Sequence, residues 1–468
     1  MDVATIYALA TPAPTRARPG ALATIRVSGP RATDVFLFLT EERAFLRGHS
    51  ARDPSLPKPR RLAVRTLRHP LTNIEIDRAL VVWFDPPRSA TGEAVVELHL
   101  HGGRAVTAAA LDAIAALGFC RLAAPGEFTR RAFEHGKLDL TEAEGVADLV
   151  AAETEAQRRQ ALAQADGGLH RLYEGWRTVA VRLLAHLEAA IDFPDEDLPD
   201  GLADTVRTGM AAWRAELVRH LADRRGERLR EGIAIAILGP PNAGKSSLLN
   251  LLARRDAAIV SEIAGTTRDA IEVHLDLGGW PVTLVDTAGL RASDDAIERE
   301  GVRRALARAA AADLRLAVVA ADDPRGWAQA LRALVAETPG WDGARDLALV
   351  NKVDLLPDRG ALIAAQERLS LSTLTEAGLP ELLVALEARL AALMEAGADS
   401  PAPALTRARH RAAVQGCVAA LDRALVASEV ALAAEDLRLA VRELGALTGL
   451  VRVDDLLDAI FRDFCIGK

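Results

Sequence analysis

The sequence has few cysteines and no long apolar segment. Its three cysteines, Cys120, Cys417 and Cys465, lie far apart in the 468-residue chain, so it has neither a disulfide framework nor the ligand spacing of a metal site. No stretch of about 18 uninterrupted apolar residues occurs, so we expect no membrane span. The N-terminus lacks a basic region followed by an apolar core, so we expect no signal peptide. These absences predict a protein of the reducing cytoplasm.

Aromatic side chains and positive charge are also scarce. Aromatic residues make up 4% of the chain and hydrophobic residues 50%, so small and aliphatic side chains must fill the cores, which favours close-packed helices. The net charge of −8 argues against a protein that coats nucleic acid by general electrostatics. Any contact with tRNA or DNA would need a local basic patch. The length is sufficient for about three domains.

A glycine-rich segment near the middle of the chain, Gly239–Ser246, has the G-x-x-x-x-G-K-[ST] spacing of a phosphate-binding loop. It follows the apolar run Ile233–Leu238, which predicts a strand, and precedes residues 247–253, which predict a helix. Its glycines would let backbone N–H groups face a polyphosphate, and the helix N-terminus adds partial positive charge. In such a loop Lys245 would reach the β and γ phosphates and Ser246 would bind Mg²⁺.

Three further motifs follow in the order found in guanine-nucleotide-binding domains. Gly265-Thr-Thr-Arg-Asp269 is expected to form a nucleotide-sensing loop, in which Thr267 supplies a second Mg²⁺ hydroxyl. Asp286-Thr-Ala-Gly289 follows an apolar run, and its aspartate would hold the metal shell while its glycine N–H approaches the γ-phosphate. Asn351-Lys-Val-Asp354 ends in a carboxylate that can accept from two N–H groups of guanine, which adenine cannot offer. Together these motifs predict a GTPase.

The residue after the Asp-x-x-Gly motif is unusual. Many small GTPases have a glutamine there to orient the attacking water, whereas Leu290 can neither donate nor accept a hydrogen bond. An acidic segment follows, with Asp294, Asp295, Glu298 and Glu300. Acidic residues also stabilise a helix N-terminus, so the residues alone leave both a solvated helix start and a catalytic carboxylate open.

The first 126 residues have the pattern of a mixed α/β domain. Apolar runs at Leu22–Val27, Leu80–Phe84 and Ala94–Leu100 predict strands, and Ala105–Leu117 predicts a helix. Alternation over residues 95–101 puts three polar side chains on one strand face, namely Glu97, His99 and His101. A metal site is one interpretation of that face, although only this strand supplies candidate ligands.

Two helical regions flank the GTPase motifs. In the first, Thr141 and Glu144 match a Thr-x-x-Glu capping box, and apolar residues recur at helical spacing to Ile191. An acidic, proline-bearing stretch at residues 192–199 interrupts this pattern before helix resumes. The second region covers about residues 401–464. This arrangement predicts one helical domain into which the GTPase module is inserted.

The C-terminus, Phe461-Arg-Asp-Phe-Cys-Ile-Gly-Lys468, carries apolar aromatic residues almost to the end of the chain. This predicts a docked tail rather than a frayed one. Cys465 could be a nucleophile or a small packed side chain. Packing is favoured, because no neighbouring residue indicates a lowered thiol pKa.

Several segments outside the GTPase motifs point to one family. They are Ile25-Arg-Val-Ser-Gly29, Thr91-Gly-Glu93, Glu97-Leu-His-Leu-His-Gly-Gly103, Pro125-Gly-Glu-Phe-Thr129, Arg131-Ala-Phe133, Gly136-Lys-Leu-Asp-Leu140, Ala190-Ile-Asp-Phe-Pro-Asp-Glu196 and Phe464-Cys-Ile-Gly-Lys468. With them, the sequence resembles over its whole length the bacterial tRNA modification GTPases MnmE (TrmE), which act on the wobble uridine. The Pro-Gly-Glu-Phe-Thr block and the terminal pentapeptide are the most specific parts of the resemblance.

The resemblance implies a multidomain α/β and α protein. Residues 1–126 would form an α/β domain that binds tetrahydrofolate and dimerises, 127–231 and 392–468 a split helical domain, and 232–391 an inserted Ras-like P-loop GTPase domain. An FAD-dependent MnmG (GidA)-type partner in a heterotetramer is also implied. Together they would attach an aminomethyl or carboxymethylaminomethyl group to C5 of the wobble uridine of certain tRNAs, with 5-formyl- or 5,10-methylene-tetrahydrofolate as the one-carbon cofactor.

At the matching motif positions, the resemblance implies that the folate is contacted by Arg26, Glu97, Lys137 and Lys468. Arginine and lysine can pair with the glutamate carboxylates of the ligand, and Glu97 can accept from the pterin donors. This role replaces the metal interpretation of the Glu97 strand. It also assigns a ligand-binding function to the docked tail, which ends in Lys468.

The resemblance also implies fast GTP hydrolysis assisted by K⁺, with two GTPase domains meeting across the nucleotide. Glu298 lies at the spacing of the family's water-orienting glutamate and would act with Lys245 and Thr267. Mg²⁺ would bind Ser246 and Thr267. K⁺ would bind Asn242 and the loop that holds Ser261, Ile263 and Thr266. The expected GTP-contacting residues are Asn242, Ala243, Gly244, Lys245, Ser246, Ser247, Ser261, Thr266, Thr267, Asp286, Thr287, Ala288, Gly289, Asn351, Lys352, Asp354, Ser372, Thr373 and Leu374.

Some positions depart from the family pattern. Arg16-Ala-Arg-Pro-Gly20 stands in place of a Gly-Arg-Gly-Gly-like turn, and Pro240 in place of a more usual arginine. Ser372-Thr-Leu374 stands where Ser-Ala-Lys-like residues are common. These departures bear on the loop near the N-terminus and on the guanine contacts.

Three functions are compatible with these features. The first is the tRNA-modifying GTPase. The second is a regulatory or ribosome-associated GTPase switch without one-carbon chemistry, which leaves Glu97, Lys137 and Lys468 without a role. The third is a folate-dependent one-carbon transferase with a degenerate GTPase, which the intact motifs disfavour.

Overall fold

A computed structural model describes most of the chain. It covers residues 4–15, 20–40, 58–192, 202–255, 272–286, 310–356, 369–395 and 403–449, and also 457, 460, 461, 464 and 467. Two compact units emerge from the contacts within the chain. One comprises Met1–Ala147 with Gly445–Lys468, and the other comprises Asp148–Leu444.

The first unit is built on a mixed six-stranded sheet in the order β3-β4-β5-β2-β1-β6. Neighbouring strands pair antiparallel, except that β1 and β6 run parallel. The strands are β1 (Thr5–Leu9), β2 (Leu22–Ser28), β3 (Ala63–Arg68), β4 (Glu75–Phe84), β5 (Val95–His101) and β6 (Cys120–Leu122). The three strands and the helix expected from the sequence are present.

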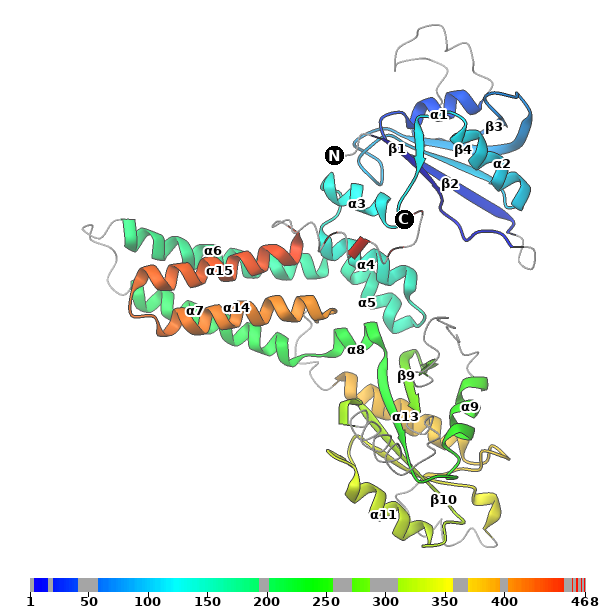
Figure 1. Ribbon diagram of the computed structural model, residues 1–468. Coiled ribbons are helices and arrows are strands. Elements are labelled where there is room, and N and C mark those ends of the chain that lie inside the picture. The colour runs from blue at the N-terminus through cyan, green and yellow to red at the C-terminus, as the bar shows by residue number, and fades with distance from the viewer. Residues whose placement is uncertain are drawn as a thin grey trace, which may run out of the picture. The chain divides into compact units, whose positions relative to one another are not determined.

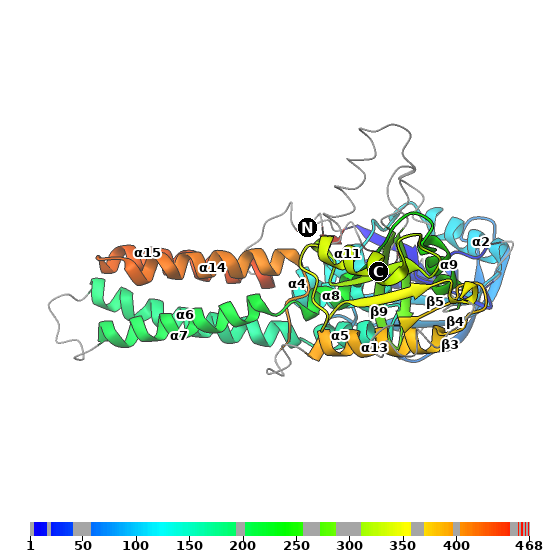
Figure 2. The same cartoon turned by 90° about the horizontal axis from the view of Figure 1, so that it is seen from below.

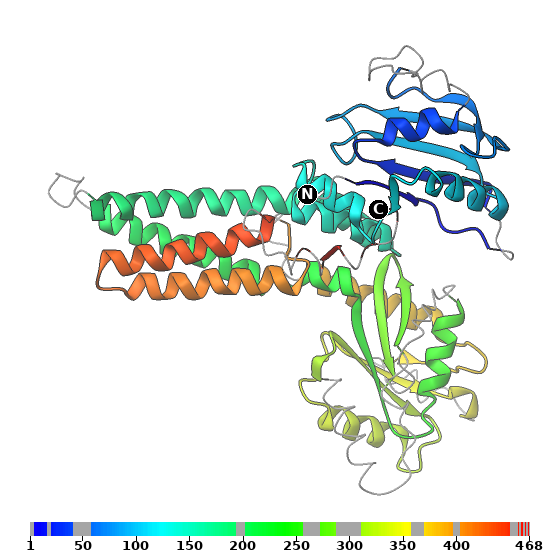
Figure 3. The same ribbon diagram turned by 45° about the horizontal axis from the view of Figure 1, so that its top comes forward.

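One face of this sheet is covered by helices α1 (Ala32–Leu39) and α2 (Arg104–Ala115), as Figures 1 and 3 show. Ile25, Leu98 and Phe36 are fully buried between the sheet and these helices. Because side chains alternate along a strand, Arg26 and Glu97 lie on the opposite face, where they are paired in register. The alternation predicted for β5 is therefore confirmed.

The end of the chain packs into the first unit. Phe461 and Phe464 are buried with Leu140 and Phe133 in one cluster, which includes helices α3 (Glu127–Glu134) and α4 (Leu140–Ala151). Gly467 is also buried and lies so close to β1 that an added Cβ would be 2.3 Å from the Leu9 carbonyl oxygen. The described residues of the tail are therefore docked, as predicted.

The capping box expected at Thr141 and Glu144 is wrong by two residues. Asp139 accepts from the Glu142 N–H through Oδ1 at 2.7 Å, and its own N–H donates to Glu142 Oε2 at 2.8 Å. Thr141 and Glu144 are instead buried inside α4. Aspartate is an equally good N-cap residue, and here it precedes the apolar positions that start the helix.

Four long helices of the second unit lie side by side, as Figures 1 and 2 show: α6 (Gly168–Asp192), α7 (Leu202–Ala222), α14 (Ala408–Val426) and α15 (Val430–Thr448). Ion pairs join helices that precede the GTPase motifs to helices that follow them. Arg214 of α7 pairs with Asp422 of α14, and Arg438 of α15 pairs with Glu188 of α6. The predicted split helical domain is therefore confirmed.

Between these helices in the sequence lies a second six-stranded sheet, with the order β12-β11-β10-β7-β9-β8. All its strands run parallel except β8, which forms a hairpin with β9. They are β7 (Ile233–Leu238), β8 (Glu272–Leu277), β9 (Trp280–Asp286), β10 (Leu314–Ala320), β11 (Leu347–Asn351) and β12 (Leu369–Ser370).

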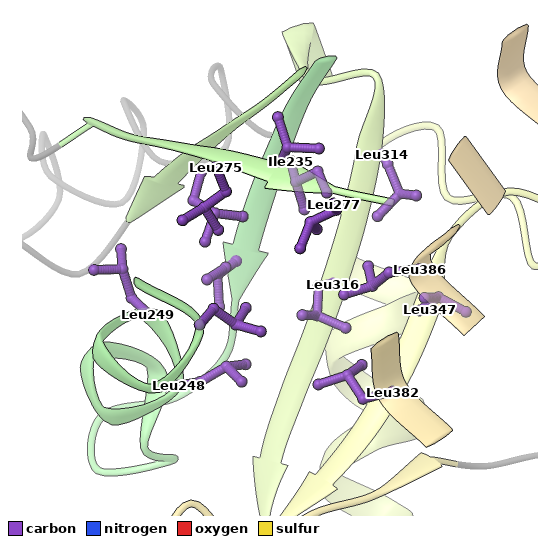
Figure 4. Close-up of a cluster of buried hydrophobic side chains, with 14 of the residues drawn as sticks. Ile235, Leu248, Leu249, Leu275, Leu277, Leu314, Leu316, Leu347, Leu382 and Leu386 are labelled. Carbon is purple, nitrogen blue, oxygen red and sulfur yellow. The ribbon is translucent and has the colours of Figure 1, made fainter. Parts of the chain in front are cut away.

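Helices cover both faces of this sheet. On one face, Leu248 of α9 (Lys245–Arg255) and Leu382 of α13 (Leu379–Glu395) pack with Ile235 and Leu316 of the central strands, as Figure 4 shows. On the other face, α11 (Trp327–Glu337) packs on β10. The central strands are buried on both sides, as expected of parallel strands with helices on both faces. This is the Ras-like P-loop architecture that the family resemblance implied.

Helix α8 (Arg225–Glu231) leads directly into β7 and is tied on several sides. Its Glu227 accepts from Arg411 of α14 in two bonds, at 2.8 and 2.9 Å. Arg230 of α8 and Arg407 before α14 share the carboxylate of Asp148. The chain therefore enters and leaves the GTPase module at one ion-paired junction. Among the helices that the structure describes, no candidate membrane span is found.

The Glu227–Arg411 pair generates a stability prediction. Burial raises the pKa of the Glu227 carboxyl, but the hydrogen bonds from Arg411, followed by those from Arg224, outweigh it and hold the pKa below its ordinary value. A carboxyl with a lowered folded-state pKa stabilises the fold above its unfolded pKa, which is about 4.3 for Glu. That contribution is lost as the pH falls through the folded pKa.

We therefore expect Glu227→Ala to lower the free energy of unfolding at pH 7 by about 2 kcal/mol, because Arg411 is left half-buried without its carboxylate. Urea denaturation followed by circular dichroism measures this. The difference from wild type should shrink below about pH 4.3. Glu155→Ala, which removes an exposed ion pair with Arg158, is the matched control and should show little change. Equal effects of both variants would contradict the prediction.

Candidate functional site

The phosphate-binding loop lies between β7 and α9, where two glycines allow close approaches of the chain. Gly239 has a φ of 155°, and a Cβ there would lie 2.0 Å from the Val318 carbonyl oxygen. Gly244 has a φ of 90°, and a Cβ there would lie 2.1 Å from Asn351 Nδ2. Asn242 also has a positive φ, 62°. Only glycine fits the first two positions, so the spacing of the motif follows from this geometry.

Lys245 begins α9 and is 7% exposed. Its Nζ donates to the carbonyl oxygens of Gly239 and Pro240, at 2.8 and 2.9 Å. The ammonium is thus held over the loop, beside the helix N-terminus. Ser246 and Ser247 follow in the first helical turn and are exposed. An anion in this loop would meet the ammonium, the backbone N–H groups and the helix dipole together.

Asn351, at the end of β11, connects this loop to the predicted base-binding end. Its side chain is fully buried, and its Nδ2 donates to the Ala243 carbonyl oxygen at 2.9 Å. Its Oδ1 accepts from the Thr373 N–H at 3.3 Å. One amide therefore joins three segments that lie far apart in the sequence.

Asp354 is oriented by Ser372. The buried Ser372 hydroxyl donates to Asp354 Oδ1 at 2.5 Å and accepts from the Thr375 N–H at 3.1 Å. Ser372 therefore has a structural role in this segment, in which Thr373 and Leu374 depart from the family pattern. Leu374, by contrast, is 82% exposed. Lys352 has a left-handed backbone conformation, and its Nζ lies 3.5 Å from Asp322 Oδ1.

The structure thus brings the loop residues and the residues of β11 and β12 to one edge of the sheet. Asp286 ends β9 opposite Ile237 of β7, so its backbone lies at the same edge. Other predicted GTPase-site residues lie outside the described residues: Ser261, Ile263, Thr266, Thr267, Thr287, Ala288, Gly289 and Glu298.

A second polar constellation lies on the open face of the first sheet. Arg26 Nε donates to Glu97 Oε1 at 2.9 Å, and the Arg26 guanidinium lies 5.8 Å from the centre of the Phe128 ring. Lys137 is not joined to this pair by the contacts of the described residues: its Nζ donates to the Pro87 carbonyl oxygen, in the segment between β4 and β5, at 2.9 Å. Lys468, the fourth predicted folate ligand, lies outside the described residues.

Residues that the sequence did not single out individually support this region. Buried Arg131 of α3 donates to Glu93 at 3.1 Å and to Glu127 at 2.9 Å. Ser28 of β2 also donates to Glu93, at 2.7 Å. This network joins β2, the loop after β4, and α3. The signal in the sequence was that all four residues, Ser28, Glu93, Glu127 and Arg131, fall in the quoted motif blocks.

The metal interpretation of the β5 face receives no support from the geometry. His101 Nδ1 lies 2.8 Å from Asp77 Oδ1 and therefore has a separate partner from Glu97. In the described part of the chain, no three His, Cys, Asp or Glu side chains are grouped so that they could hold a metal ion.

The second sheet, its phosphate-binding loop and the Asn351–Asp354–Ser372 end define a P-loop GTPase of Ras-like topology. Two family models match the chain: the MnmE helical domain over residues 140–465, and the GTP-binding protein TrmE N-terminus over residues 5–137. The chain therefore belongs to the MnmE family of tRNA modification GTPases.

Individual relatives agree with this assignment over nearly the whole chain. The tRNA modification GTPase MnmE of Rhodospirillum rubrum is 54% identical, with 100% of both chains covered. That of Parvibaculum lavamentivorans is 52% identical, covering 99% of this chain and 100% of the relative. The mitochondrial 5-taurinomethyluridine-[tRNA] synthase subunit GTPB3 of Rattus norvegicus is 46% identical, covering 96% and 91%.

The Ser372–Asp354 bond generates a prediction for nucleotide affinity. Ser372→Ala removes the donor that fixes Asp354 and leaves the Thr375 N–H without its acceptor. We expect GTP to bind about tenfold more weakly, because a hydrogen bond to a charged group is lost. Preference over ATP should also fall. Competition titrations with a fluorescent guanine nucleotide measure both, with Glu381→Ala on the exposed side of α13 as control. Unchanged affinity and preference would refute the role of Ser372.

Proposed function

We propose that this chain hydrolyses GTP as part of a tRNA-modifying enzyme that acts at C5 of the wobble uridine. The proposal rests most directly on identity of about half the residues, over the full length, to proteins named tRNA modification GTPases. The geometry of the phosphate-binding loop and of the Asp354–Ser372 pair supports the GTPase part. The product is a tRNA whose wobble uridine carries an aminomethyl or carboxymethylaminomethyl group at C5. The enzyme acts in the cytoplasm, where its tRNA substrate is found.

In the GTPase site, Lys245 binds the β and γ phosphates, and Mg²⁺ is held by the hydroxyls of Ser246 and Thr267. Asp286 supports the metal shell. Asp354 accepts hydrogen bonds from the N–H groups of guanine. Asn351 links the base-binding end of the site to the phosphate-binding loop through its hydrogen bond to the Ala243 carbonyl oxygen. The remaining contacts to GTP come from the loop residues, the 287–289 segment, and Lys352 and residues 372–374.

Potassium assists hydrolysis in this proposal. Asn242 is exposed in the phosphate-binding loop and has a left-handed backbone conformation, with a φ of 62°. Asn242 and the segment with Ser261, Ile263 and Thr266 would hold K⁺, which would supply positive charge between the phosphates. Glu298 orients the attacking water, since Leu290 cannot. Lys245 and Thr267 complete the catalytic set.

A tetrahydrofolate that carries the one-carbon unit binds on the open face of the first sheet. Arg26 and Glu97 form an ion pair there, and both keep part of their side chains exposed. Buried Gly467 lies against Leu9 and Ala10, next to Ala8, which pairs in register with Arg26. This position supports a role for the adjoining Lys468, together with Lys137, in holding the ligand. The cofactor is 5-formyl- or 5,10-methylene-tetrahydrofolate.

The same face supports a homodimer. Val64 and Leu80 are opposite each other in register and are 65% and 44% exposed, and Leu22 on this face is 67% exposed. Apolar side chains of this size on an open sheet face favour burial against a second copy.

An FAD-dependent MnmG-type protein completes a heterotetramer. The domains run over residues 1–126, 127–231, 232–391 and 392–468, with the second and fourth forming the helical domain.

Deleting the gene tests the proposed function. We expect the wobble-uridine modification to disappear from hydrolysed tRNA when nucleosides are quantified by mass spectrometry. The wild-type gene should restore it, and Lys245→Ala should not. An unchanged nucleoside profile would contradict the proposal. Co-sedimentation of the chain with ribosomal subunits in that case would favour a ribosome-associated switch.

The potassium mechanism makes a separate prediction. Glu298→Ala should slow GTP hydrolysis in KCl about 100-fold or more, because water orientation by a carboxylate contributes on that order. GTP affinity should change less than about twofold, and Glu300→Ala, in the same acidic segment, should stay near wild type. Replacing KCl by NaCl should slow the wild type. Phosphate release and nucleotide titration measure these quantities, and a large loss of affinity with little loss of rate would refute the role of Glu298.

A further inference from the structure

His99 is the one polar neighbour of Glu97 on β5 whose role is not yet accounted for. The two side chains share the open face of the sheet, and His99 Nε2 lies 3.5 Å from Glu97 Oε2. On its other side, His99 Nδ1 lies 3.2 Å from the Thr24 hydroxyl of β2. His99 is half-buried, with about a third of its side chain exposed. Both ring nitrogens are therefore directed along the sheet face.

The two oxygens of Glu97 are flanked by different groups. Oε1 accepts from the Arg26 guanidinium, whose Nε and Nη2 both lie 2.9 Å away, and Oε2 faces His99. A carboxylate offers about four lone-pair sites, so these two neighbours leave acceptor capacity unused. Groups on both oxygens also hinder rotation of the carboxylate plane.

We propose that His99 is a positioning residue that fixes the Glu97 carboxylate for the donor edge of a pterin-type ligand. This rests on the proposed folate site. A pterin presents a ring N–H and an amino group side by side, and both must meet acceptors in one plane. An acceptor already held in that plane loses less conformational freedom when the ligand binds.

The Thr24 hydroxyl is compatible with a His99 tautomer that donates toward Glu97. If Nε2 carries the proton toward Glu97, Nδ1 accepts from the Thr24 O–H, and in the doubly protonated ring both nitrogens donate. The Thr24 N–H in turn donates to Thr11 Oγ1 at 3.2 Å, which ties this end of β2 to the segment after β1. Across the sheet, the residue opposite His99 on β4 is Leu80, which offers no hydrogen bond.

His101 is a natural comparison for His99. It lies on the same strand and on the same face, but it is more exposed and pairs with Asp77 instead of Glu97. The two histidines therefore have the same side chain and lie on the same strand and the same sheet face. They differ in whether their imidazole faces the carboxylate that is proposed to bind the ligand.

The test is a calorimetric titration of the full-length protein with 5-formyltetrahydrofolate. We expect His99→Leu to weaken binding about tenfold, because the polar group that faces Glu97 Oε2 at 3.5 Å is lost and the carboxylate is held less firmly. His99→Gln, which keeps an N–H donor, should recover most of that loss. His101→Leu should stay within about twofold of wild type. Thermal melting and GTP hydrolysis, unchanged in all three variants, establish that each is folded.

The outcomes separate the two levels of the proposal. Wild-type binding with His99→Leu unaffected overturns the positioning role and leaves the folate site standing. Equal weakening by His99→Leu and His99→Gln also overturns it, because a merely structural role would not be rescued by a donor. Absence of binding by the folded, GTP-hydrolysing wild type refutes the folate site itself, and the role of His99 with it.

Discussion

The ion-paired junction around Glu227 and Arg411 is the constraint on which the rest of the second unit depends. The helical domain needs α14 and α15 to cover α6 and α7, yet these pairs are separated in sequence by the entire GTPase module. The chain can close the bundle only if it leaves and returns at nearly the same place. Arg411 donates to Glu227 across that gap, and Asp148 holds Arg230 and Arg407 together. Because α8 runs directly into β7 and the phosphate-binding loop, this junction also anchors the nucleotide site.

A second contact joins the GTPase module to the helices. The Ala156 N–H, in the first turn of α5 (Glu155–Ala165), donates to the Gly279 carbonyl oxygen in the turn between β8 and β9 at 3.3 Å. In the sequence, that hairpin lies between the Gly265–Asp269 motif and the Asp286–Gly289 motif. Farther along α5, the Gln160 side chain donates to the Gly226 carbonyl oxygen of α8 at 3.0 Å. The helical domain therefore contacts the module both at its entry and at the hairpin.

Much of this arrangement could be predicted from the sequence where the physical requirement is local. The phosphate-binding loop needs glycines at fixed positions, and Gly239 and Gly244 are used as expected. The alternation in β5 correctly placed Glu97 and His99 on one face. The capping box was misplaced because Thr141 and Asp139 are both competent caps and only packing decides between them. Short strands such as β6 lack a pattern of their own, and their pairing depends on β1.

Interactions between distant segments could not be predicted in the same way. Nothing in the residues around Asn351 indicates that its amide reaches Ala243, and nothing around Ser372 indicates its bond to Asp354. The Arg131–Glu93–Ser28 network likewise depends on three elements meeting. These contacts arise from the fold, and they convert separate motifs into two sites: one for a nucleotide on the second sheet, and one proposed for folate on the first.

The central claim is that the chain combines GTP hydrolysis with one-carbon transfer to tRNA. The most direct test supplies the purified protein, the proposed FAD-dependent partner, unmodified tRNA, GTP and a tetrahydrofolate labelled with ¹³C in the one-carbon unit. Mass spectrometry of the wobble nucleoside should show incorporation of one labelled carbon with the wild type and none with Lys245→Ala. Modification without label would contradict the folate route. Labelled product at an undiminished level from the Lys245 variant would contradict the dependence on GTP.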